Sequence, residues 1–286
     1  MTRSRLRPSI GLQVGAFLLF SLAPIHAFRL VPISQDFAPS GKRASQLFRI
    51  ENPDEKRIAV QISVATREMD MDGNETNVDA SDSFIVYPSQ LLVDPGETGT
   101  VRVKWTGDPN PASELAYRII AEEIPLGDPE PGEEQGAGIR IVFRYVGNIY
   151  VLPRGAEPNV VLVSASAESA PDGSRRLVLV FHNQGTSHTI LRNLSLRFTR
   201  RTEAAAGAPA AGDPAAGDPT AVAPPGGDPP ADPPEGTTVL VLDAERLAGM
   251  AGENILAGSR RKFKLPFPSE LQEGDFDVSF SYERVR

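Results

Sequence analysis

The stretch that decides the fold of this chain is IRIVFRYVGNIYVLP, residues 139–153. Alternate residues of an extended strand share one side, and here that side carries Ile139, Ile141, Phe143 and Tyr145. The stretch holds no proline before Pro153, as expected of a strand whose backbone takes part in a sheet. An unpaired strand with such an apolar side recruits other strands. Two interpretations therefore stay open: an ordinary core strand, or an edge strand kept for a partner.

Most of the remaining sequence also consists of short strand-like segments, separated by Pro, Gly, Asp and Asn turn residues. Before residue 139 the expected strands are 28–33, 45–52, 57–68, 83–94, 98–105 and 115–124. After residue 158 they are 159–168, 175–183, 190–200, 237–243, 259–267 and 276–283. Only residues 242–250 favour a helical turn or two. A run of strands without long helices predicts an all-β fold built from antiparallel sandwiches.

The segment PRGAEP, residues 153–158, has a proline at each end and is typical of a stiff linker. We therefore expect two domains, residues 28–152 and 153–286. Residues 203–236 interrupt the second domain and consist almost entirely of Ala, Pro, Gly and Asp. Such a composition buries too little apolar surface to offset chain entropy, so it predicts a disordered insertion.

The first 27 residues have the layout of a secretory signal peptide. A basic start with Arg3, Arg5 and Arg7 precedes the apolar run GLQVGAFLLFSLAP, and the segment ends in the small residue Ala27. An uncleaved anchor is the alternative, but the run is short for a bilayer span. The sequence thus predicts an exported protein that is not inserted in a membrane after the signal is removed.

The formal net charge of the chain is −8. Loss of the three signal arginines makes it more negative by three, about −11 for the exported chain. An acidic chain of this kind lacks the basic stripe that a nucleic-acid partner requires. The chain contains no cysteine, which excludes thiol redox chemistry and thiolate metal sites.

Catalytic and metal-binding groups are scarce. His182 and His188 lie six residues apart around a turn, with no acidic or thiol ligand between them, so we expect a strand histidine and a packed turn histidine. The segment EMDMDGNETN, residues 68–77, alternates acidic and amide residues, but a β-turn at Asp72-Gly73 explains it better than an EF-hand loop. The sequence predicts no enzyme activity, no metal and no cofactor.

One further segment, PSQLLVDPGETGTVRVKW at residues 88–105, has no candidate catalytic or metal-binding residues but has a regular sequence pattern. It reads as a strand, a Pro-Gly-Glu turn and an alternating strand, and this pattern predicts a hairpin. In its second strand Val101, Val103 and Trp105 should face the core, and Arg102 and Lys104 should face solvent.

Several of these stretches together resemble the periplasmic pilus (fimbrial) chaperones of the chaperone–usher pathway. The family pattern L-x-P-G-x-x-x-x-V-R-V followed by Y-R-x-x-x-x-x-I-P is similar to YPSQLLVDPGETGTVRVKW and AYRIIAEEIP here. In the second domain, FHNQGTSHTILRNLSL resembles the family's N-x-G-x-x-H turn. The resemblance covers nearly all of the exported chain except residues 203–236.

The resemblance implies two immunoglobulin-like β-sandwiches set at an angle. It also implies a mechanism in which the chaperone lends a strand to a pilus subunit that lacks one, and passes the subunit to an outer-membrane usher. Carried over to this sequence, the lent strand contains Ile139, Ile141, Phe143 and Tyr145. No cofactor is needed on this account.

The family also grips the subunit's terminal carboxylate with two basic residues. Ser34 and Asn148 stand at those two places here. Either Arg29, Arg144 or Arg154 supplies the positive charge instead, or Ser34 and Asn148 bind the carboxylate as neutral donors. The alternative to a chaperone is an exported structural or adhesive β-sandwich protein, such as a pilus subunit itself.

Overall fold

A computed structural model of the chain describes residues 27–126, 141–200, 239–271 and 276–283. The first part contains β1 (Arg29–Val31), β2 (Ser34–Phe37), η1 (Lys42–Ala44), β3 (Ser45–Glu51), β4 (Ile58–Thr66), β5 (Glu68–Met69), β6 (Glu75–Thr76), η2 (Ser81–Ser83), β7 (Phe84–Tyr87), β8 (Gln90–Val93), β9 (Thr98–Trp105), β10 (Leu115–Ile124) and β11 (Arg144–Val151). The second part contains β12 (Val160–Ser169), β13 (Arg175–Asn183), β14 (Thr189–Ile190), β15 (Arg192–Arg200), β16 (Val239–Leu242), β17 (Asn254–Ile255), β18 (Arg260–Pro266) and β19 (Phe276–Glu283). The all-β fold with two immunoglobulin-like sandwiches agrees with the sequence analysis.

The first domain is a sandwich of two sheets. One sheet has the order β1-β3-β9-β7, and the other has the order β2-β11-β10-β4-β8. The alternation of β9 works as predicted, because Val101, Val103 and Trp105 are buried while Arg102 and Lys104 are exposed. Side chains from the inner faces of both sheets form one core, with Phe37, Phe48 and Ile119 among its fully buried members.

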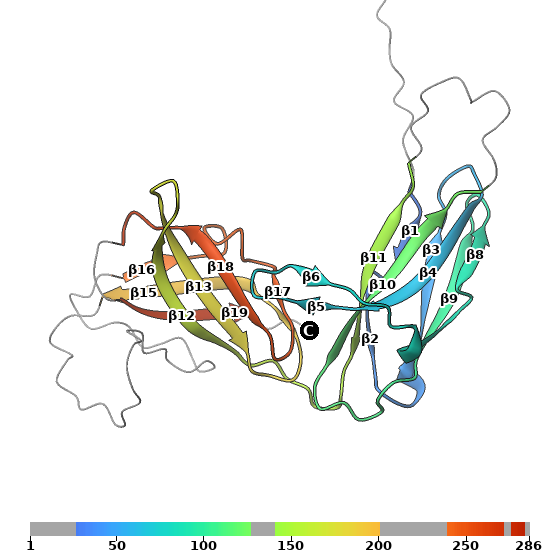
Figure 1. Cartoon of the computed structure of the whole chain (residues 1–286), viewed down its shortest axis with the longest axis horizontal. Helices are drawn as coiled ribbons and strands as arrows, with labels where there is room; N and C mark the ends of the chain where they lie inside the picture. Colours follow the sequence, from blue (N-terminus) through green and yellow to red (C-terminus); the bar gives the residue numbers. More distant parts are fainter. Residues whose placement is uncertain (1–26, 127–140, 201–238, 272–275, 284–286) are drawn as a thin grey trace, which may run out of the picture.

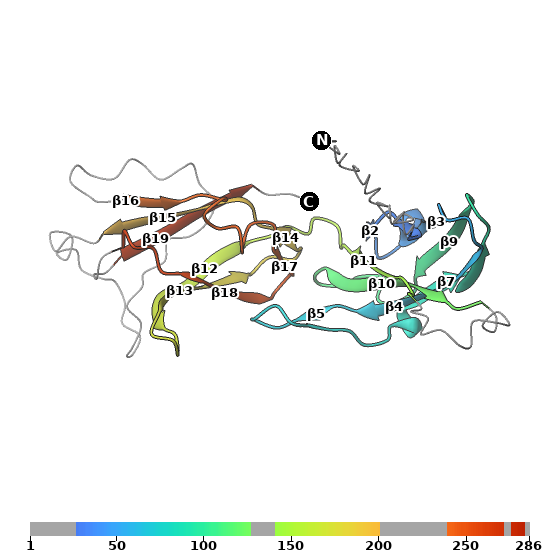
Figure 2. The same cartoon turned by 90° about the horizontal axis from the view of Figure 1, so that it is seen from above.

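The second domain holds a separate core. Its larger sheets have the orders β12-β13-β18 and β16-β15-β19, and β14 pairs with β17. Phe181, Leu194 and Leu196 are fully buried between these sheets. The two domains lie end to end at an angle, joined between β11 and β12, as Figures 1 and 2 show.

Two sequence expectations about strands were wrong. Residues 88–105 do not form a hairpin, because β8 pairs with β4 in one sheet while β9 pairs with β3 and β7 in the other. The turn between them therefore crosses from sheet to sheet. Asn52 holds it there: its buried side-chain amide donates to the carbonyls of Val93 and Asp94.

The same arrangement divides residues 83–94, which the alternation presented as one segment. β7 and β8 lie in different sheets, on either side of Pro88. The short strand β2 was not expected at all, because SQDF has no alternation of apolar residues. It pairs in parallel with the second half of β11, from Ser34 beside Asn148 to Phe37 beside Val151.

Several expectations concern residues outside the described ranges. These are the signal segment up to residue 26, the insertion at 203–236 and Ile139 at the start of the strand 139–153. Among the residues that the structure does describe, no helix has the length and hydrophobicity of a membrane span.

Candidate functional site

The first half of β11 has an open edge. Along its whole length β11 pairs with β10, and Val151 back to Asn148 also pair with β2 on the other side. No strand of the described ranges pairs with Arg144–Gly147 on that second side. This half-paired segment is the kind of sheet edge to which another chain can add a strand.

Two backbone hydrogen bonds show which backbone groups point to the open edge. The N–H of Glu123 donates to the carbonyl of Phe143 at 2.9 Å, whereas the N–H of Asn148 donates away from β10, to Ile33 at 2.8 Å. Backbone groups of successive strand residues point in alternate directions. The N–H and C=O groups of Arg144 and Val146 therefore face the open edge, and those of Tyr145 face β10.

The side chains of this stretch are divided between the two faces of the sheet. Phe143 and Tyr145 pack partly buried against the first core, where the ring of Tyr145 lies 4.8 Å from that of Phe28. Ile141, just before β11, leaves 53% of its surface exposed, and Val142 and Val146 are also exposed. An apolar cluster thus surrounds the open edge.

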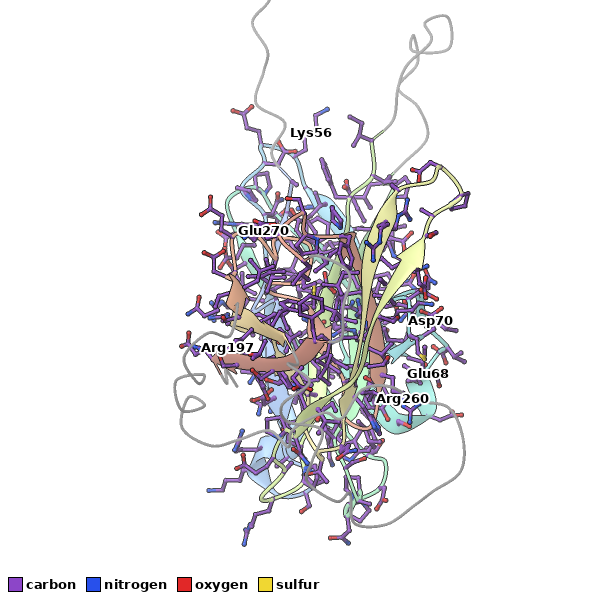
Figure 3. All side chains as sticks on the ribbon, turned by 90° about the vertical axis from the view of Figure 1, so that its left-hand side faces the viewer. Lys56, Glu68, Asp70, Arg197, Arg260 and Glu270 are labelled. Carbon is purple, nitrogen blue, oxygen red and sulfur yellow. The ribbon has the colours of Figure 1, made fainter. Side chains whose placement is uncertain are left out.

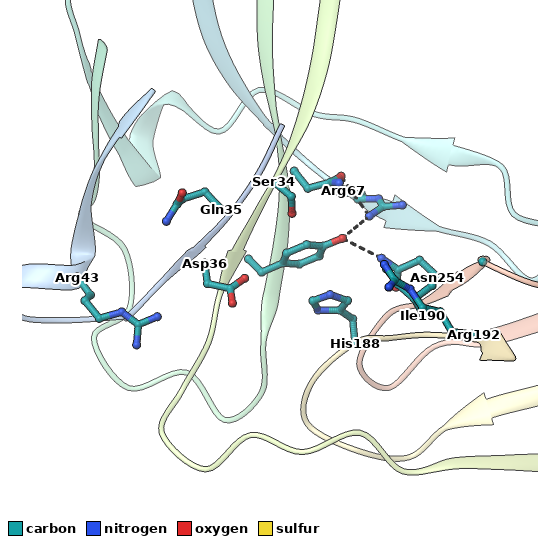
Figure 4. Close-up of a pocket in the computed structure, with 12 residues that line it drawn as sticks. Ser34, Gln35, Asp36, Arg43, Arg67, His188, Ile190, Arg192 and Asn254 are labelled. Carbon is teal, nitrogen blue, oxygen red and sulfur yellow. Dashed lines mark hydrogen bonds between the residues drawn. The ribbon is translucent and has the colours of Figure 1, made fainter. Parts of the chain in front are cut away.

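A cavity of about 640 Å³ lies between the domains, at the end of β11 where β2 joins it. Figure 4 shows Ser34, Asp36 and Arg67 of the first domain facing His188, Arg192 and Asn254 of the second across this cleft. Ser34 and Asn148, which the resemblance placed together, both line it.

Arginines gather at one wall of the cleft. The buried guanidinium of Arg67 donates to the hydroxyl of Tyr150 at 2.8 Å and contacts the side-chain oxygen of Asn148 at 3.4 Å. Arg118 also donates to that oxygen of Asn148. Both guanidinium groups bind the carboxylate of Glu75, Arg67 at 2.8 Å and Arg118 through Nε at 2.9 Å.

The electrostatics of this cluster follow from its geometry. Burial raises the pKa of Glu75, but hydrogen bonds from Arg118 and the charge of Arg67 outweigh it, and the pKa lies below the ordinary value. Burial raises the pKa of Tyr150. Glu75 thus compensates one of the two positive charges of Arg67 and Arg118, whereas Arg43 and Arg192 at the cleft form no ion pair with another described residue.

The other wall joins the two domains through His188. Its Nδ1 lies 2.7 Å from Oε2 of Glu114, and its backbone N–H donates to the same oxygen at 3.1 Å. The ring of Tyr150 stacks on the imidazole with 3.7 Å between centroids. Nearby, burial is the largest effect on Asp36 and raises the pKa of its carboxyl group, and Glu114 adds to the rise.

The N-x-G-x-x-H turn of the sequence acquires a physical explanation. Asn183 is fully buried, and its amide donates to the carbonyls of Ser187 at 2.8 Å and Ile255 at 3.1 Å. Its side-chain oxygen accepts from the N–H of Asn159 at 3.0 Å. These bonds fix the loop that carries His188 to the first domain, while His182 stays within β13 as expected.

The remaining predicted residues lie away from the cleft or in a turn. Arg29 binds Glu51 at 3.0 Å, and Arg144 lies 3.6 Å from Glu122, so neither lines the cavity between the domains. The expected turn at Asp72-Gly73 is present, with the N–H of Gly73 donating to Asp70 at 3.1 Å. No group of three potential metal ligands is found among the described residues.

Residues 38–157 match the family of pili and flagellar-assembly chaperones, through its PapD N-terminal domain. This match covers most of the first domain, which is therefore similar to the N-terminal domain of that family. The match spans the cleft residues Asn148 and Tyr150 and the whole of β11. A search of the curated proteins finds no match to the sequence.

Solved pilus chaperones resemble the chain over most of its length. The class 5 fimbriae chaperone CfaA is 12% identical, with a TM-score of 0.48 over 90% of this chain and 100% of its own. A chain of the CsuC–CsuE complex from Acinetobacter baumannii is 14% identical, with a TM-score of 0.47 over 83% and 90%. The E. coli chaperone DraB is 15% identical, with a TM-score of 0.44 over 85% and 88%. All three TM-scores lie below 0.5, so the likeness to the chaperone family rests on the match of residues 38–157.

The sequence analysis did not identify most of the polar residues of the cleft between the domains. Arg67 follows β4 as one of many surface-like arginines, Glu75 begins the two-residue strand β6, and Glu114 directly precedes β10, and neither glutamate belongs to a motif. The family resemblance gave a signal for His188, through its turn, and for Ser34 and Asn148. The long-range contacts among these residues join segments that the sequence does not mark as neighbours.

Proposed function

We propose that this chain is a periplasmic chaperone that binds pilus or fimbrial subunits by lending them the open half of β11. The observation that carries the proposal is the edge at Arg144–Gly147, which β10 pairs on one side and no described strand pairs on the other. A subunit that lacks a strand would find there the backbone donors and acceptors that it needs.

Apolar side chains next to this edge supply the other part of the binding energy. Ile141 is half exposed, and Phe143 and Tyr145 form a half-buried ridge on the inner face of the sheet. Full burial of a wholly exposed side chain of this kind contributes about 1.5–3 kcal/mol, so a half-exposed one gains about half of that. We include Ile139 in the lent strand on the alternation of the sequence, since it lies outside the described residues.

The cleft is our candidate for the subunit's terminal carboxylate. Ser34 and Asn148 lie side by side there and can donate hydrogen bonds, but neither carries a charge. Arg43 and Arg192 line the same cavity with no ion pair among the described residues, so they can supply the charge. Arg29 and Arg144 remain candidates for an anchor outside the cleft, because both are exposed at a sheet surface.

The same proposal implies a cellular compartment for the chaperone and an acceptor for the bound subunit. The basic and apolar start of the chain would direct it to the periplasm and be removed there. An outer-membrane usher is the expected acceptor of the bound subunit. Binding and handing over a subunit by strand exchange needs no enzymatic step, metal or nucleotide.

Capture of a subunit tests the proposal. The tagged chain, expressed in the periplasm together with a pilus subunit, should copurify with it, and Ile141→Asp should abolish the copurification. Ile85→Asp is the matched control, because Ile85 is also 53% exposed in the same domain but lies on β7 of the opposite sheet. Equal capture by the wild type and both variants would overturn the proposal.

A further inference from the structure

The hairpin formed by β5 and β6 leaves the first domain and reaches the second. It continues from the end of β4 and turns at residues 70–73. Figures 1 and 2 both show it extending from the first sandwich to the neighbourhood of β17 and β18. Two paired residues on each strand are too few to fold as an independent hairpin, so contacts outside the hairpin must hold it.

The tip of the hairpin is bonded to β18. The backbone N–H of Lys262 donates to the carbonyl of Met71 at 2.6 Å. The ammonium group of the same lysine lies 2.9 Å from the carboxylate of Asp72. In Figure 3, which looks along the long axis, Glu68 and Asp70 of the hairpin appear on the same side as Arg260 of β18.

Arg261 forms the centre of this contact. It is 5% exposed, its Nη2 donates to Glu253 at 3.0 Å, and its Nη1 contacts the sulfur of Met69. The guanidinium lies directly against the backbone of Gly73, where an added Cβ would be 2.6 Å from Nη2. Gly73 also has a φ of +90°, so only glycine suits both the turn and the close approach.

The base of the hairpin is bonded to the wall of the cleft. Glu75 of β6 holds Arg67 and Arg118, and Arg67 in turn contacts Tyr150. Tyr150 accepts a hydrogen bond of 2.8 Å from Asn254 of the second domain. The hairpin therefore contacts both domains and, through Glu75, the residues that line the cleft between them.

We propose that hairpin β5–β6 is an interdomain latch that fixes the angle between the two domains and, with it, the width of the cleft. Arg261 and Lys262 hold its tip and Glu75 holds its base. Without the tip contacts, the two domains would be held by the linker, the hydrogen bond from Asn254 to Tyr150 and the contacts of His188. The latch does not rest on the proposed function, because it concerns contacts within the chain.

Spin-label distances test the latch without any partner. The chain has no cysteine, so Thr100→Cys in β9 and Ser166→Cys in β12 give one unique label on an exposed strand of each domain. We expect a narrow distance distribution in this background. Adding Gly73→Val should broaden the distribution, because its side chain would displace Arg261 from the tip.

Gly173→Val is the matched control. Gly173 also sits at a hairpin tip with a φ of +81° and an N–H donating three residues back, but an added Cβ there meets nothing within 4 Å. It should leave the distance distribution narrow.

A second pair of variants tests the ion pair between Lys262 and Asp72. Lys262→Glu should broaden the distance distribution, and Asp72→Lys combined with Lys262→Glu should narrow it again.

Two results would overturn the latch. One is an equally narrow distribution in Gly73→Val and in the unmodified background. The other is a broad distribution in that background itself. Neither result bears on whether the open edge of β11 binds a subunit, so the two proposals fail separately.

Discussion

Glu114 and His188 join the two domains through a buried contact, with 2.7 Å between the carboxylate Oε2 and the imidazole Nδ1. The side chain of Glu114 is only 1% exposed, and the backbone N–H of His188 donates to the same oxygen. A second backbone bond, from the N–H of Glu114 to the carbonyl of Thr186, lies beside it. This contact closes the wall of the cleft opposite the hairpin.

Removal of the imidazole should weaken the interface. In His188→Ala the buried carboxylate of Glu114 keeps only the backbone N–H, and an incompletely satisfied buried acceptor costs about 1–3 kcal/mol. The free energy of urea unfolding should fall by that amount. His182→Ala, in β13, should change it far less, and equal losses in the two variants would contradict the assigned role of His188.

Asp36→Asn should stabilise the protein at neutral pH. Burial raises the pKa of Asp36 in the folded state, so its charged form is disfavoured there relative to the unfolded chain. The penalty is present above the folded pKa and vanishes below the ordinary value of 3.8, where both states are protonated. The melting temperature of the variant should exceed that of the wild type at pH 7 and match it in acid. The exposed Asp82→Asn should show no such difference.

Glu75→Gln should have the opposite pH dependence. The pKa of Glu75 is lowered in the folded state, so its contribution is present above the unfolded value of 4.5 and is lost as the pH falls through the folded pKa. The variant should be less stable than the wild type at pH 7, and the difference should shrink on acidification below pH 4.5. A difference that is constant with pH would show that the charge of Glu75 is not what holds Arg67 and Arg118.

Gly147→Ala should separate β2 from β11. An added Cβ would lie 2.7 Å from the backbone oxygen of Ile33 and 2.9 Å from the side chain of Ile119, and a backbone atom cannot move away by changing rotamer. We expect a loss of about 1–3 kcal/mol, typical of overpacking. Faster hydrogen exchange at the Asn148 amide, which donates to Ile33, would locate the damage.

The sequence was a good guide wherever a short-range pattern decides the structure. The alternation in β9 places Val101 and Val103 in the core, as expected. It did not predict which strands pair where the partners lie far apart in the sequence. β8 and β9 look like a hairpin because a turn joins two strands, yet the choice of sheet depends on β3 and β4.

The candidate site divides in the same way. Alternation placed Ile141 and Tyr145 on one side of a strand, and the family resemblance made that strand the lent one. The resemblance also paired Ser34 with Asn148, which do lie side by side. Alternation does not reveal that only half of β11 has a second neighbour, because β2 has no apolar pattern. The charge cluster around Glu75 forms because hairpin β5–β6 brings Glu75 to Arg67 and Arg118, and the sequence predicted only the turn of that hairpin.

Hydrogen exchange at the open edge of β11 tests the central claim most directly. In the free protein the amides of Arg144 and Val146 should exchange quickly, because they face the edge that no described strand pairs. The amide of Tyr145, which faces β10, should already be protected. Binding of a pilus subunit should protect Arg144 and Val146 and leave Tyr145 unchanged. Unchanged exchange at Arg144 and Val146 in a complex shown to contain the subunit would contradict strand donation.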